Sequence, residues 1–572
     1  MRIREVGESA LVLDVGATYA SPLRGAVVDA GINARAVALA DTIRARRIAG
    51  VRDVVSTFHS VTVFFEPLVA DAAALASALR EASVAPPTIP SGRLIEVPVT
   101  YGGKAGPDLA DVAALAGCTP AEVIERHAAR TYRVYMLGFL PGYPYMAIVD
   151  EQIAVPRRAT PRVRVPAGSV AIAGRQTGIY PRESPGGWQI IGRTNLTLFD
   201  AEAEPPALFA PGDEVRFVPV DADVASGSPD VASGFSRTDV RPKADTTYEG
   251  AIRTITVLQP GLLTTIQDEG RWGYQGLGVP VAGPMDPVAH RLANALVGNP
   301  REAATLEATL IGPELRFDQD TWIVVTGGDL QPALDGRDAP MYAPLHCRAG
   351  SVLRFGSRRS GARAYIAVDG GIAVPPVLGS RATHVLSGLG GIDGRALRAG
   401  DRLPMGRPGL KAGPYPRPDF ARAIAGADRQ LGPQAGPAGG VRLRILPGPQ
   451  ADSFDPTAFD LLQQCRYTIS PQSDRMGYRL TGGVRLPAPA GEMISDVVFS
   501  GALQVPPSGE PILLMADRQT TGGYPQIALV IAADLPLAAQ LAPGDCVEFE
   551  VCSRSEAIEA LRAQEGQLGA LR

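Results

Sequence analysis

Two short polar stretches of this chain carry residue types that suit the binding of a small polar molecule. They are Arg175, Gln176, Thr177 and Tyr180 in the first stretch, and Arg518, Gln519, Thr520 and Tyr524 in the second. Arginine offers a planar fork of donors for a carboxylate or phosphate, and glutamine both donates and accepts hydrogen bonds. Flanking glycines allow a tight turn and a close ligand approach. A purely structural turn is the alternative, but the repeated polar triplet favours a site.

Two histidines are candidates for proton transfer, because the pKa of a free imidazole lies near neutrality. His127 lies in the last turn of a predicted helix, and His290 lies four residues after Asp286 in another. The alternative for His127 is a favourable charge at a helix C-terminus, and Asp286 is expected to cap its own helix. Gln176 and Gln519 complete the candidate catalytic group. We interpret as structural the remaining histidines, which are His59, His346 and His384.

A charged segment beside two aromatic residues has the character of a pocket rim. It reads QDEGRWGYQ and places Asp268, Glu269 and Arg271 next to Trp272 and Tyr274. Aromatic side chains supply apolar walls, and the charged groups can orient a polar ligand. We therefore count Asp268 and Arg271 among the candidate binding residues.

Three further segments have both a binding and a structural interpretation. Asp474 and Arg475 in SDRMGYRL suit an anionic group or an internal salt bridge. The proline-stiffened loop GFLPGYPYM (138–146) could wall a pocket or pack in the core. Gly186 and Gly187 offer backbone amides for an anion, which is a weak signal by itself.

Composition sets the class of protein. The 572 residues are too many for one core and suggest roughly three or four domains, while 64 glycines and 51 prolines between short apolar runs predict many turns and a β-rich fold. A net charge of −4 gives no reason to expect a nucleic-acid partner. Five scattered cysteines without a CxxC pair predict neither disulfides nor a metal site. Without a signal peptide or an apolar run of about 20 residues, we expect a cytoplasmic protein with no membrane contact.

Changes in pattern divide the chain into six segments. A β-α-β-β-α order near the N-terminus suggests a split-βαβ unit, and a polar stretch containing DVASG twice suggests a linker. The segments are a small α+β domain (1–88), a β-barrel domain (89–220), a flexible linker (221–250), a first β-rich part (251–407), a Pro/Gly-rich excursion (408–440) and a second β-rich part (441–555).

The two polar stretches belong to a longer internal repeat. Each is followed by an apolar strand and then by a Pro-Gly-Asp turn into a last strand, in LFAPGDEVRFV (208–218) and LAPGDCVEFEV (541–551). Two such matches in the same order predict related β-barrel units. A shared fold does not by itself require shared chemistry.

At these motifs the chain resembles two known families. The first half, with YRVYMLGFLPGYPYM, VPAGSVAIAGRQTGIYP and SPGGWQIIGRT, resembles the allophanate-hydrolase-subunit-1 or KipI-like family. The second half, with GLLTTIQDEGRWGYQGLGVPVAGPMDPVAHRLANALVGN, SDRMGYRL and ADRQTTGGYPQIA, resembles the subunit-2 or KipA-like family. The resemblance covers nearly everything except the linkers. It implies a mainly β chain with an α+β N-terminal domain and cyclophilin-like β-barrel domains in both halves.

The resemblance implies three functional contexts. Such pairs occur as the B and C subunits of bacterial ATP-dependent 5-oxoprolinase, as the carboxyltransferase part of urea carboxylase, and as a regulator of a histidine kinase. This chain has no Met-Lys-Met turn for attached biotin, and GGKAG (102–106) is not a P-loop. A carboxyltransferase would therefore need a separate biotin carrier.

The absence of carrier and carboxylase domains favours a fused B–C component of 5-oxoprolinase. It would activate the lactam of 5-oxo-L-proline with ATP and Mg, and a separate LamB/YcsF-like A subunit of 5-oxoprolinase would complete hydrolysis to glutamate. The alternatives are a biotin-dependent carboxyltransferase acting on a small amide, and a non-catalytic kinase regulator. We expect the site where the Gln-Thr-Gly loops of the two halves approach each other.

Overall fold

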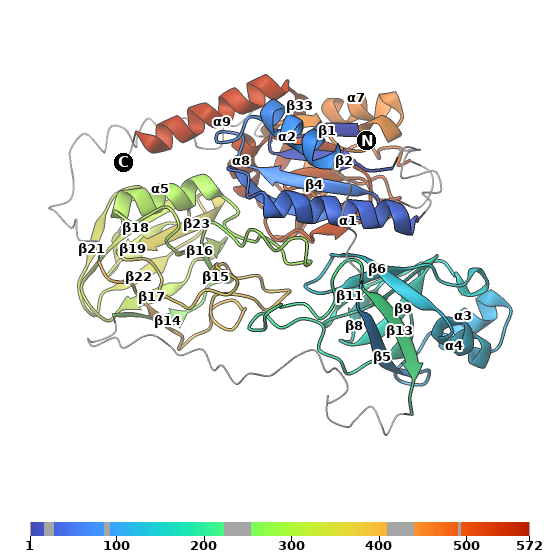
Figure 1. Ribbon diagram of the computed structural model, residues 1–572. Helices are drawn as coiled ribbons and strands as arrows, with labels where there is room; N and C mark the ends of the chain where they lie inside the picture. Colours follow the sequence, from blue (N-terminus) through green and yellow to red (C-terminus); the bar gives the residue numbers. More distant parts are fainter. Residues whose placement is uncertain are drawn as a thin grey trace.

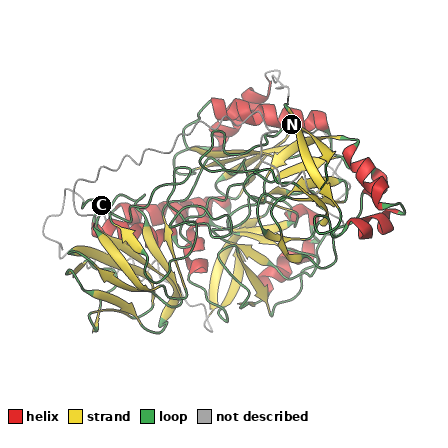
Figure 2. Cartoon of the chain, turned by 90° about the horizontal axis from the view of Figure 1, so that it is seen from below, coloured by secondary structure: helices red, strands yellow, loops and turns green. Residues whose placement is uncertain are grey.

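The computed structural model describes residues 2–16, 28–84, 92–221, 253–408, 440–489 and 493–570. Apart from their ends, the predicted linker (221–250) and excursion (408–440) lie outside these residues. Figure 1 shows the first barrel at lower right, a β-sandwich at left, and the N-terminal domain above them beside the second barrel. Figure 2 shows the strands in separate groups with helices around them. No helix among the described residues is long and apolar enough to cross a membrane.

The N-terminal domain is an antiparallel sheet with two helices. Its elements are β1 (Arg2–Val6), β2 (Ala10–Asp14), α1 (Ala30–Ala45), β3 (Val51–Ser56), β4 (Ser60–Phe65) and α2 (Ala72–Val84). The strand order is β1-β2-β4-β3 with every pair antiparallel. In the order β2-β4-β3, strand β4 lies between β2 and β3, the two strands that α1 connects, so these elements have the arrangement of a split-βαβ unit. Residues 2–6 form an additional strand, and a turn at Gly7, whose φ is 59°, returns the chain directly into β2.

The two faces of this sheet pack against different parts of the chain. One face is covered by the apolar sides of α1 and α2, including Leu39 and Leu79. The other face carries Val12 and Phe64, which pack against Val498 of the second half. The N-terminal domain is thus docked on the second barrel, far along the sequence.

Seven strands close the first barrel, and those at Pro144–Ala147 and Ser169–Ala173 are buried along their whole length. Its elements are β5 (Leu94–Tyr101), α3 (Leu109–Ala116), α4 (Pro120–Ala128), β6 (Thr131–Leu137), β7 (Pro144–Ala147), η1 (Glu151–Ile153), β8 (Arg162–Val165), β9 (Ser169–Ala173), β10 (Gln176–Ile179), β11 (Ser184–Gly186), β12 (Gln189–Arg193) and β13 (Glu214–Pro219). A capping box formed by Thr119 and Glu122 begins α4.

The first β-rich part of the second half is a sandwich. Its elements are β14 (Thr254–Gln259), β15 (Leu263–Gln267), α5 (Pro287–Val297), β16 (Thr305–Thr309), β17 (Glu314–Phe317), β18 (Thr321–Asp329), β19 (Pro332–Leu334), β20 (Arg337–Asp338), β21 (Leu345–Cys347), β22 (Val352–Phe355), β23 (Ser360–Val368) and β24 (Arg402–Pro404). The sheets β20-β19-β22-β17-β14-β24 and β15-β16-β23-β18-β21 enclose one apolar core. Helix α5 packs on β18 and β23, begins with the expected Asp286 cap and ends at Gly298.

The second barrel contains the last strands of the chain. Its elements are β25 (Gly440–Pro447), η3 (Ala451–Ser453), α7 (Pro456–Gln464), β26 (Tyr467–Ile469), β27 (Gly477–Thr481), β28 (Asp496–Val497), β29 (Ala502–Gln504), β30 (Ile512–Leu514), β31 (Thr521–Gly522), β32 (Gln526–Val530), η4 (Ala532–Asp534), α8 (Leu535–Ala539) and β33 (Cys546–Val551). Helix α9 (Arg554–Gly569) follows the barrel and crosses the top of Figure 1.

The two barrels have the same topology, which confirms the predicted barrel in each half. The first closes in the order β5-β13-β6-β7-β10-β9-β12, and the second in the order β25-β33-β26-β27-β30-β29-β32. In each, the strand after the Pro-Gly-Asp turn runs parallel to the first strand of the barrel. Both barrels also have a small side sheet, β8 with β11 and β28 with β31.

This equivalence corrects the alignment of the two polar stretches. Because β31 corresponds to β11 and β32 to β12, DRQTTGGYPQI matches PRESPGGWQI, and the counterpart of Arg518 is Arg182. Gln176 instead begins β10, whose counterpart β30 ends before Arg518. The pairing of the two Arg-Gln-Thr triplets is therefore wrong as a structural equivalence, since a three-residue match is weaker than the order of seven strands.

Candidate functional site

The outer surface of the first barrel carries a cluster of aromatic rings, which we call the aromatic face. It consists of Tyr135, Tyr143, Tyr145, Tyr180 and Trp188. The rings of Tyr143 and Tyr145 are 4.9 Å apart and those of Tyr143 and Tyr180 are 5.2 Å apart. Burial raises the pKa of each of these four tyrosines, so all four hydroxyls stay protonated.

Loops of the second half cover the aromatic face. Leu386 and Ile494 pack against it, and the Thr521 hydroxyl lies 3.5 Å from the Tyr145 hydroxyl. Gly138 allows this approach, because a Cβ there would lie 2.3 Å from Thr521 Oγ1. The aromatic face is therefore the place where the two halves meet.

Gln176 lies on the same side of β10 as Gly178, next to the aromatic face. Its strand partners are Ala147 and Ala173, which pack with the rings of the aromatic face. A Cβ at Gly178 would lie 2.6 Å from the Tyr143 hydroxyl. The Gln176 side-chain oxygen is buried and has no partner among the described residues. A buried oxygen without a donor can receive a hydrogen bond from a ligand.

In the second half, the segment 519–522 points toward the same interface. The Gln519 side chain folds over Gly522, where a Cβ would lie 2.6 Å from Gln519 Nε2. The Thr520 hydroxyl is buried and has no partner within the part of the chain that the structure describes. Gln176 and the loop of Gln519 are thus on the two sides of one interface, although they are not equivalent in the two barrels.

Arg157 and Arg182, which were not predicted from the sequence, add positive charge at this interface. A Cβ at Gly523 would lie 3.4 Å from Arg157 Nη2, and one at Gly388 would lie 2.8 Å from Arg182 Nη2. Neither guanidinium forms an ion pair within the described ranges, and burial lowers the pKa of Arg182. The match of PRESPGGW to DRQTTGGY is the sequence signal that could have revealed Arg182.

His127 lies inside the first barrel rather than on the aromatic face. Its Nε2 is 2.9 Å from the Thr177 hydroxyl, which donates to Ala171 O, and its Nδ1 is 2.8 Å from the Tyr101 hydroxyl. These contacts suit a neutral ring with the proton on Nε2, and burial lowers its pKa to about 3. We therefore assign His127 and Thr177 to the barrel core and not to the site.

Replacing His127 with glutamine is expected to reduce the loss of unfolding free energy that accompanies a fall in pH below neutrality. The folded chain keeps this ring neutral down to a pKa of about 3, whereas the unfolded ring takes up a proton near 6.5. Stability is therefore lost as pH falls below the unfolded value, by about 1.4 kcal/mol per pH unit. Urea unfolding of both proteins at about pH 6 and about pH 5 measures the difference. Equal losses in the two proteins would contradict a buried neutral ring.

His290 and Asp286 also have structural partners. His290 is buried, with Nδ1 2.9 Å from the Thr305 hydroxyl and Nε2 3.2 Å from Arg301 O. Asp286 accepts from Ala289 N, as a cap does, and from Gln540 Nε2 at 2.8 Å. Burial raises the pKa of Asp286 to about 6. These contacts give no substrate-facing role to either residue.

The two predicted charged segments are placed differently from the expectation. Arg475 is buried and ion-paired with Asp517 and Glu307, whereas Asp474 is exposed and accepts from the backbone of a tight turn. Arg475 and Asp474 therefore do not form the suggested pair, and the internal salt bridge uses other carboxylates.

In the other segment, Asp268 accepts hydrogen bonds from Ser380 Oγ and Arg381 N at 2.5 Å. Arg271 donates to the carbonyls of Val377 and Ala382 at 2.8 and 2.9 Å. Asp268 and Arg271 thus fasten the loop that leads to Leu386.

The outermost candidates are Arg175 and Tyr524. The Arg175 side chain is 57% exposed and lies 3.3 Å from Glu151, and Tyr524 is 38% exposed. Both belong to the surface.

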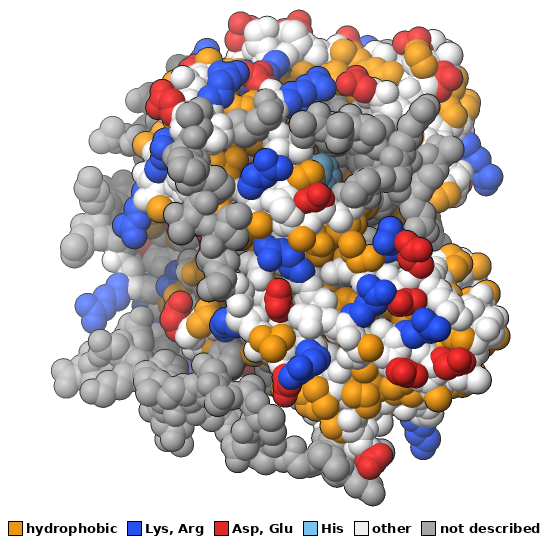
Figure 3. All heavy atoms as spheres, turned by 45° about the vertical axis from the view of Figure 1, so that its right-hand side comes forward, with side chains coloured by type: hydrophobic (Ala, Val, Ile, Leu, Met, Phe, Trp, Pro, Cys, Tyr) orange, Lys and Arg blue, Asp and Glu red, His pale blue; other side chains and the backbone are white. Residues whose placement is uncertain are grey.

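On the face shown in Figure 3, blue Lys and Arg side chains are interspersed with red Asp and Glu side chains, so neither sign dominates the coloured surface.

A cavity of about 240 Å³ lies between the N-terminal domain and the second half. We call it the central cavity. Its lining includes Phe64 and Glu66 at the end of β4, Glu269 and Trp272, and Arg518. Asp268, Arg271 and Tyr274, from the same segment as Trp272, do not line it. Among the described residues, no three His, Cys, Asp or Glu side chains form a group that could hold a metal ion.

Comparison with known proteins identifies the family. Residues 1–209 match the family described as carboxyltransferase domain, subdomain C and D, and residues 277–551 match carboxyltransferase domain, subdomain A and B. The chain belongs to the carboxyltransferase-domain family. Each half therefore supplies one pair of its subdomains, in the order C and D before A and B.

Curated relatives match each half separately. The chain is 39% identical to the C subunit of 5-oxoprolinase from Escherichia coli over 311 residues, which are 54% of this chain and 95% of that protein. It is 44% identical to the B subunit of 5-oxoprolinase from Haemophilus influenzae over 183 residues, which are 30% of this chain and 83% of that protein. It is also 33% identical over 329 residues to urea amidolyase of Saccharomyces cerevisiae, covering 55% of this chain and 17% of that protein.

A solved structure matches both halves together. The crystal structure of the protein TTHA0988 superimposes with a TM-score of 0.77 at 33% identity and covers 96% of this chain and all of that one. The joined arrangement of the two halves is therefore shared with another single chain.

Proposed function

We propose that this chain is the fused B–C component of an ATP-dependent 5-oxoprolinase and acts with a separate LamB/YcsF-like A subunit in the cytoplasm. The observation that carries the proposal is that one chain matches a B-type relative in its first half and a C-type relative along its second. The contact of Thr521 with Tyr145 supports it, because the two halves form one surface.

The proposed chemistry begins with a poor electrophile. Transfer of the γ-phosphoryl group of ATP to the lactam carbonyl oxygen would release ADP and make the ring carbon reactive. Addition of water and cleavage of the C–N bond would open the ring to an acyl phosphate, and a second water would release phosphate and glutamate. Mg would accompany ATP, and the LamB/YcsF-like protein would complete the hydrolysis. The reaction therefore needs donors for carbonyl and phosphoryl oxygens.

The interface at the aromatic face offers such donors. Arg157 and Arg182 carry positive charge that no described carboxylate neutralises, and Gln176 and Gln519 can orient a lactam amide. The surrounding tyrosine rings exclude water, which strengthens these interactions. We propose this interface as the reaction site.

Alanine at Gln176, and separately at Gln519, is expected to lower 5-oxoproline-dependent turnover by about 3- to 10-fold, which is the loss of one neutral hydrogen bond. Thermal unfolding should stay close to that of the wild type, because neither side chain is fully buried. Arg175→Ala is the matched control, since Arg175 lies on the surface beside Gln176. Full activity of both glutamine variants would remove the shared site from the proposal.

A second candidate function is a carboxyltransferase that uses a separate biotin carrier. The match to urea amidolyase and the descriptions of both matching domains favour it. The test is ATP hydrolysis by the purified chain with the LamB/YcsF-like protein, with and without 5-oxoproline and with and without avidin. Hydrolysis that needs 5-oxoproline and resists avidin supports the oxoprolinase. Turnover that requires a biotinylated protein and bicarbonate, and stops with avidin, supports the second candidate instead.

A further inference from the structure

The central cavity is built from parts of both halves. The N-terminal domain contributes Phe64 and Arg52, the loop before α5 contributes Trp272, and the second barrel contributes Met515 and Arg518. The Arg52 guanidinium lies 5.0 Å from the centre of the Trp272 ring. Helix α9 closes one side with Leu561, Gln564 and Glu565. The cavity therefore exists only when the two halves are assembled.

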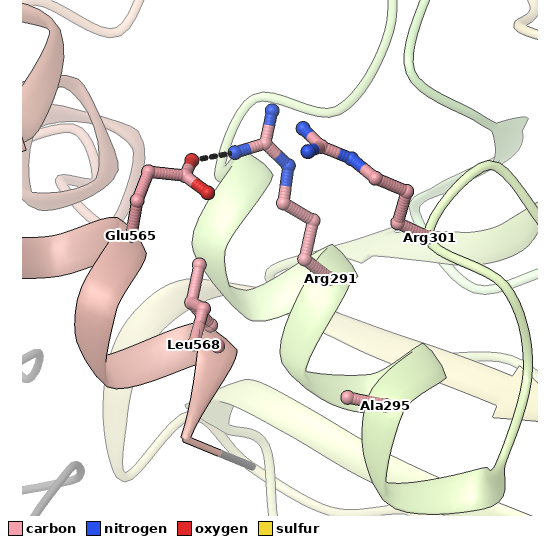
Figure 4. Close-up of a pocket in the computed structure, with 6 residues that line it drawn as sticks. Arg291, Ala295, Arg301, Glu565 and Leu568 are labelled. Carbon is pink, nitrogen blue, oxygen red and sulfur yellow. Dashed lines mark hydrogen bonds and ion pairs between the residues drawn. The ribbon is translucent and has the colours of Figure 1, made fainter. Parts of the chain in front are cut away.

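The carboxylates that line the cavity are already neutralised by arginines. Glu66 is ion-paired with Arg52. Glu269 binds Arg291 and Arg301, both at 2.8 Å. Figure 4 shows that Glu565 of α9 reaches Arg291 as well. Each glutamate of the lining is therefore paired with an arginine, so the lining does not favour a cationic ligand.

Arg518 has no such partner. It is 6% exposed, and no ion pair to it exists within the described ranges. Its hydrogen bonds, to Val498 O at 3.3 Å and to Gln275 Oε1 at 3.4 Å, are long. A buried guanidinium that lines a cavity and has no carboxylate partner suits the binding of an anion.

The size and walls of the cavity restrict the anion. A volume of about 240 Å³ is below the roughly 300–1,000 Å³ typical of pockets for drug-sized ligands, which favours a small anion over a larger one. Phe64, Trp272, Met515 and Leu535 supply apolar wall. These features suit a small organic acid with an apolar ring or chain and one carboxylate, which the planar guanidinium can hold with two parallel hydrogen bonds.

We propose that the central cavity binds the carboxylate of a small organic acid through Arg518, with Trp272 as the apolar wall. This binding site is separate from the proposed reaction site, because neither Gln176 nor Gln519 lines the central cavity. The choice of 5-oxo-L-proline as its ligand rests on the proposed function; the carboxylate site itself does not. The smaller pocket of about 90 Å³ between Arg291, Arg301 and Leu568 is a poorer candidate, because Glu269 and Glu565 already occupy its arginines.

The test is direct binding to the purified full-length chain, without ATP or the LamB/YcsF-like protein. 5-Oxo-L-proline, L-glutamate and inorganic phosphate are titrated separately by calorimetry. Because the chain has three tryptophans, a fluorescence change on binding is assigned to Trp272 only if Trp272→Phe abolishes it. We expect saturable 1:1 binding of 5-oxo-L-proline, and Arg518→Gln should weaken it by at least about 30-fold, as for a charge-assisted pair. Arg354→Gln is the matched control, with a change below about 3-fold, because Arg354 is an exposed residue paired with Glu314 and neither residue lines the cavity.

A second variant keeps the test independent of the charge. Ala516 lines the cavity, so Ala516→Leu should fill it and weaken binding while Arg518 remains. Binding of neither organic acid, binding of phosphate alone, or unchanged affinity in both Arg518→Gln and Ala516→Leu would overturn the proposal. Saturable binding of L-glutamate in place of 5-oxo-L-proline, lost in Arg518→Gln, would support the carboxylate site and exclude the lactam as its ligand. Since no turnover is measured, failure here is distinguishable from failure of the proposed function.

Discussion

Replacing Arg475 with alanine is expected to destabilise the chain by about 3–5 kcal/mol, the usual cost of removing one partner from a buried ion network. Arg475 is 5% exposed and joins Asp517 of the second barrel to Glu307 of the sandwich, and it donates to Gly283 O at 2.6 Å. Burial alone would lower its pKa, but the two carboxylates raise it above its usual value. Without Arg475, both carboxylates stay buried and unneutralised.

The measurement is the denaturation midpoint of Arg475→Ala against the wild type in urea. Asp474→Ala is the matched control, because Asp474 is the exposed neighbour and its change should stay within about 0.5 kcal/mol. A midpoint for Arg475→Ala as high as that of Asp474→Ala would show that the network does not hold the two domains together.

Placing alanine at Gly138 is expected to lower 5-oxoproline-dependent turnover by at least about 10-fold, since small displacements of reacting groups can cost about 100-fold. The new Cβ would lie 2.3 Å from Thr521 Oγ1 and 2.6 Å from Thr521 Cγ2, so the second half must move away from the aromatic face. Thr521→Ala removes both atoms. The double variant Gly138→Ala, Thr521→Ala should therefore recover most of the turnover lost.

Steady-state turnover with the LamB/YcsF-like protein checks this, with Gly566→Ala as the control. A Cβ at Gly566 meets no atom within 4 Å, so that variant should behave as the wild type. If Gly138→Ala is fully active, or if Thr521→Ala gives no rescue, the contact between the halves does not position the reaction site.

Local features of the fold could be predicted from the sequence because their causes are local. Thr119 with Glu122, and Asp286 with Gly298, mark helix ends through hydrogen bonds within one turn. The strand at residues 2–6 was not predicted, because the apolar residues of RIREV do not occupy alternate positions. The N-terminal sheet packs on the second barrel through contacts such as that of Phe64 with Phe499. This packing could not be predicted, because the pattern of a strand shows which face is buried but not which element covers it.

The candidate site shows the same limit. Arg518 and Trp272 were singled out by residue type, since a guanidinium among glycines and a charged aromatic segment are local signals. Arg157 and Arg182 were missed, because their importance depends on loops of the other half that reach them. His127 and His290 were singled out by their chemistry, yet both rings have hydrogen-bond partners in the protein interior. Residue type indicates what chemistry is possible, and only the tertiary contacts decide whether it is available.

The most direct measurement of the central claim is glutamate formation from 5-oxo-L-proline by this single chain mixed with a LamB/YcsF-like protein and ATP. The account predicts glutamate and ADP in equal amounts, and no product when the chain, the LamB/YcsF-like protein or ATP is left out. Glutamate formation that still needs a separate B-type or C-type 5-oxoprolinase protein would contradict the claim that one chain supplies both.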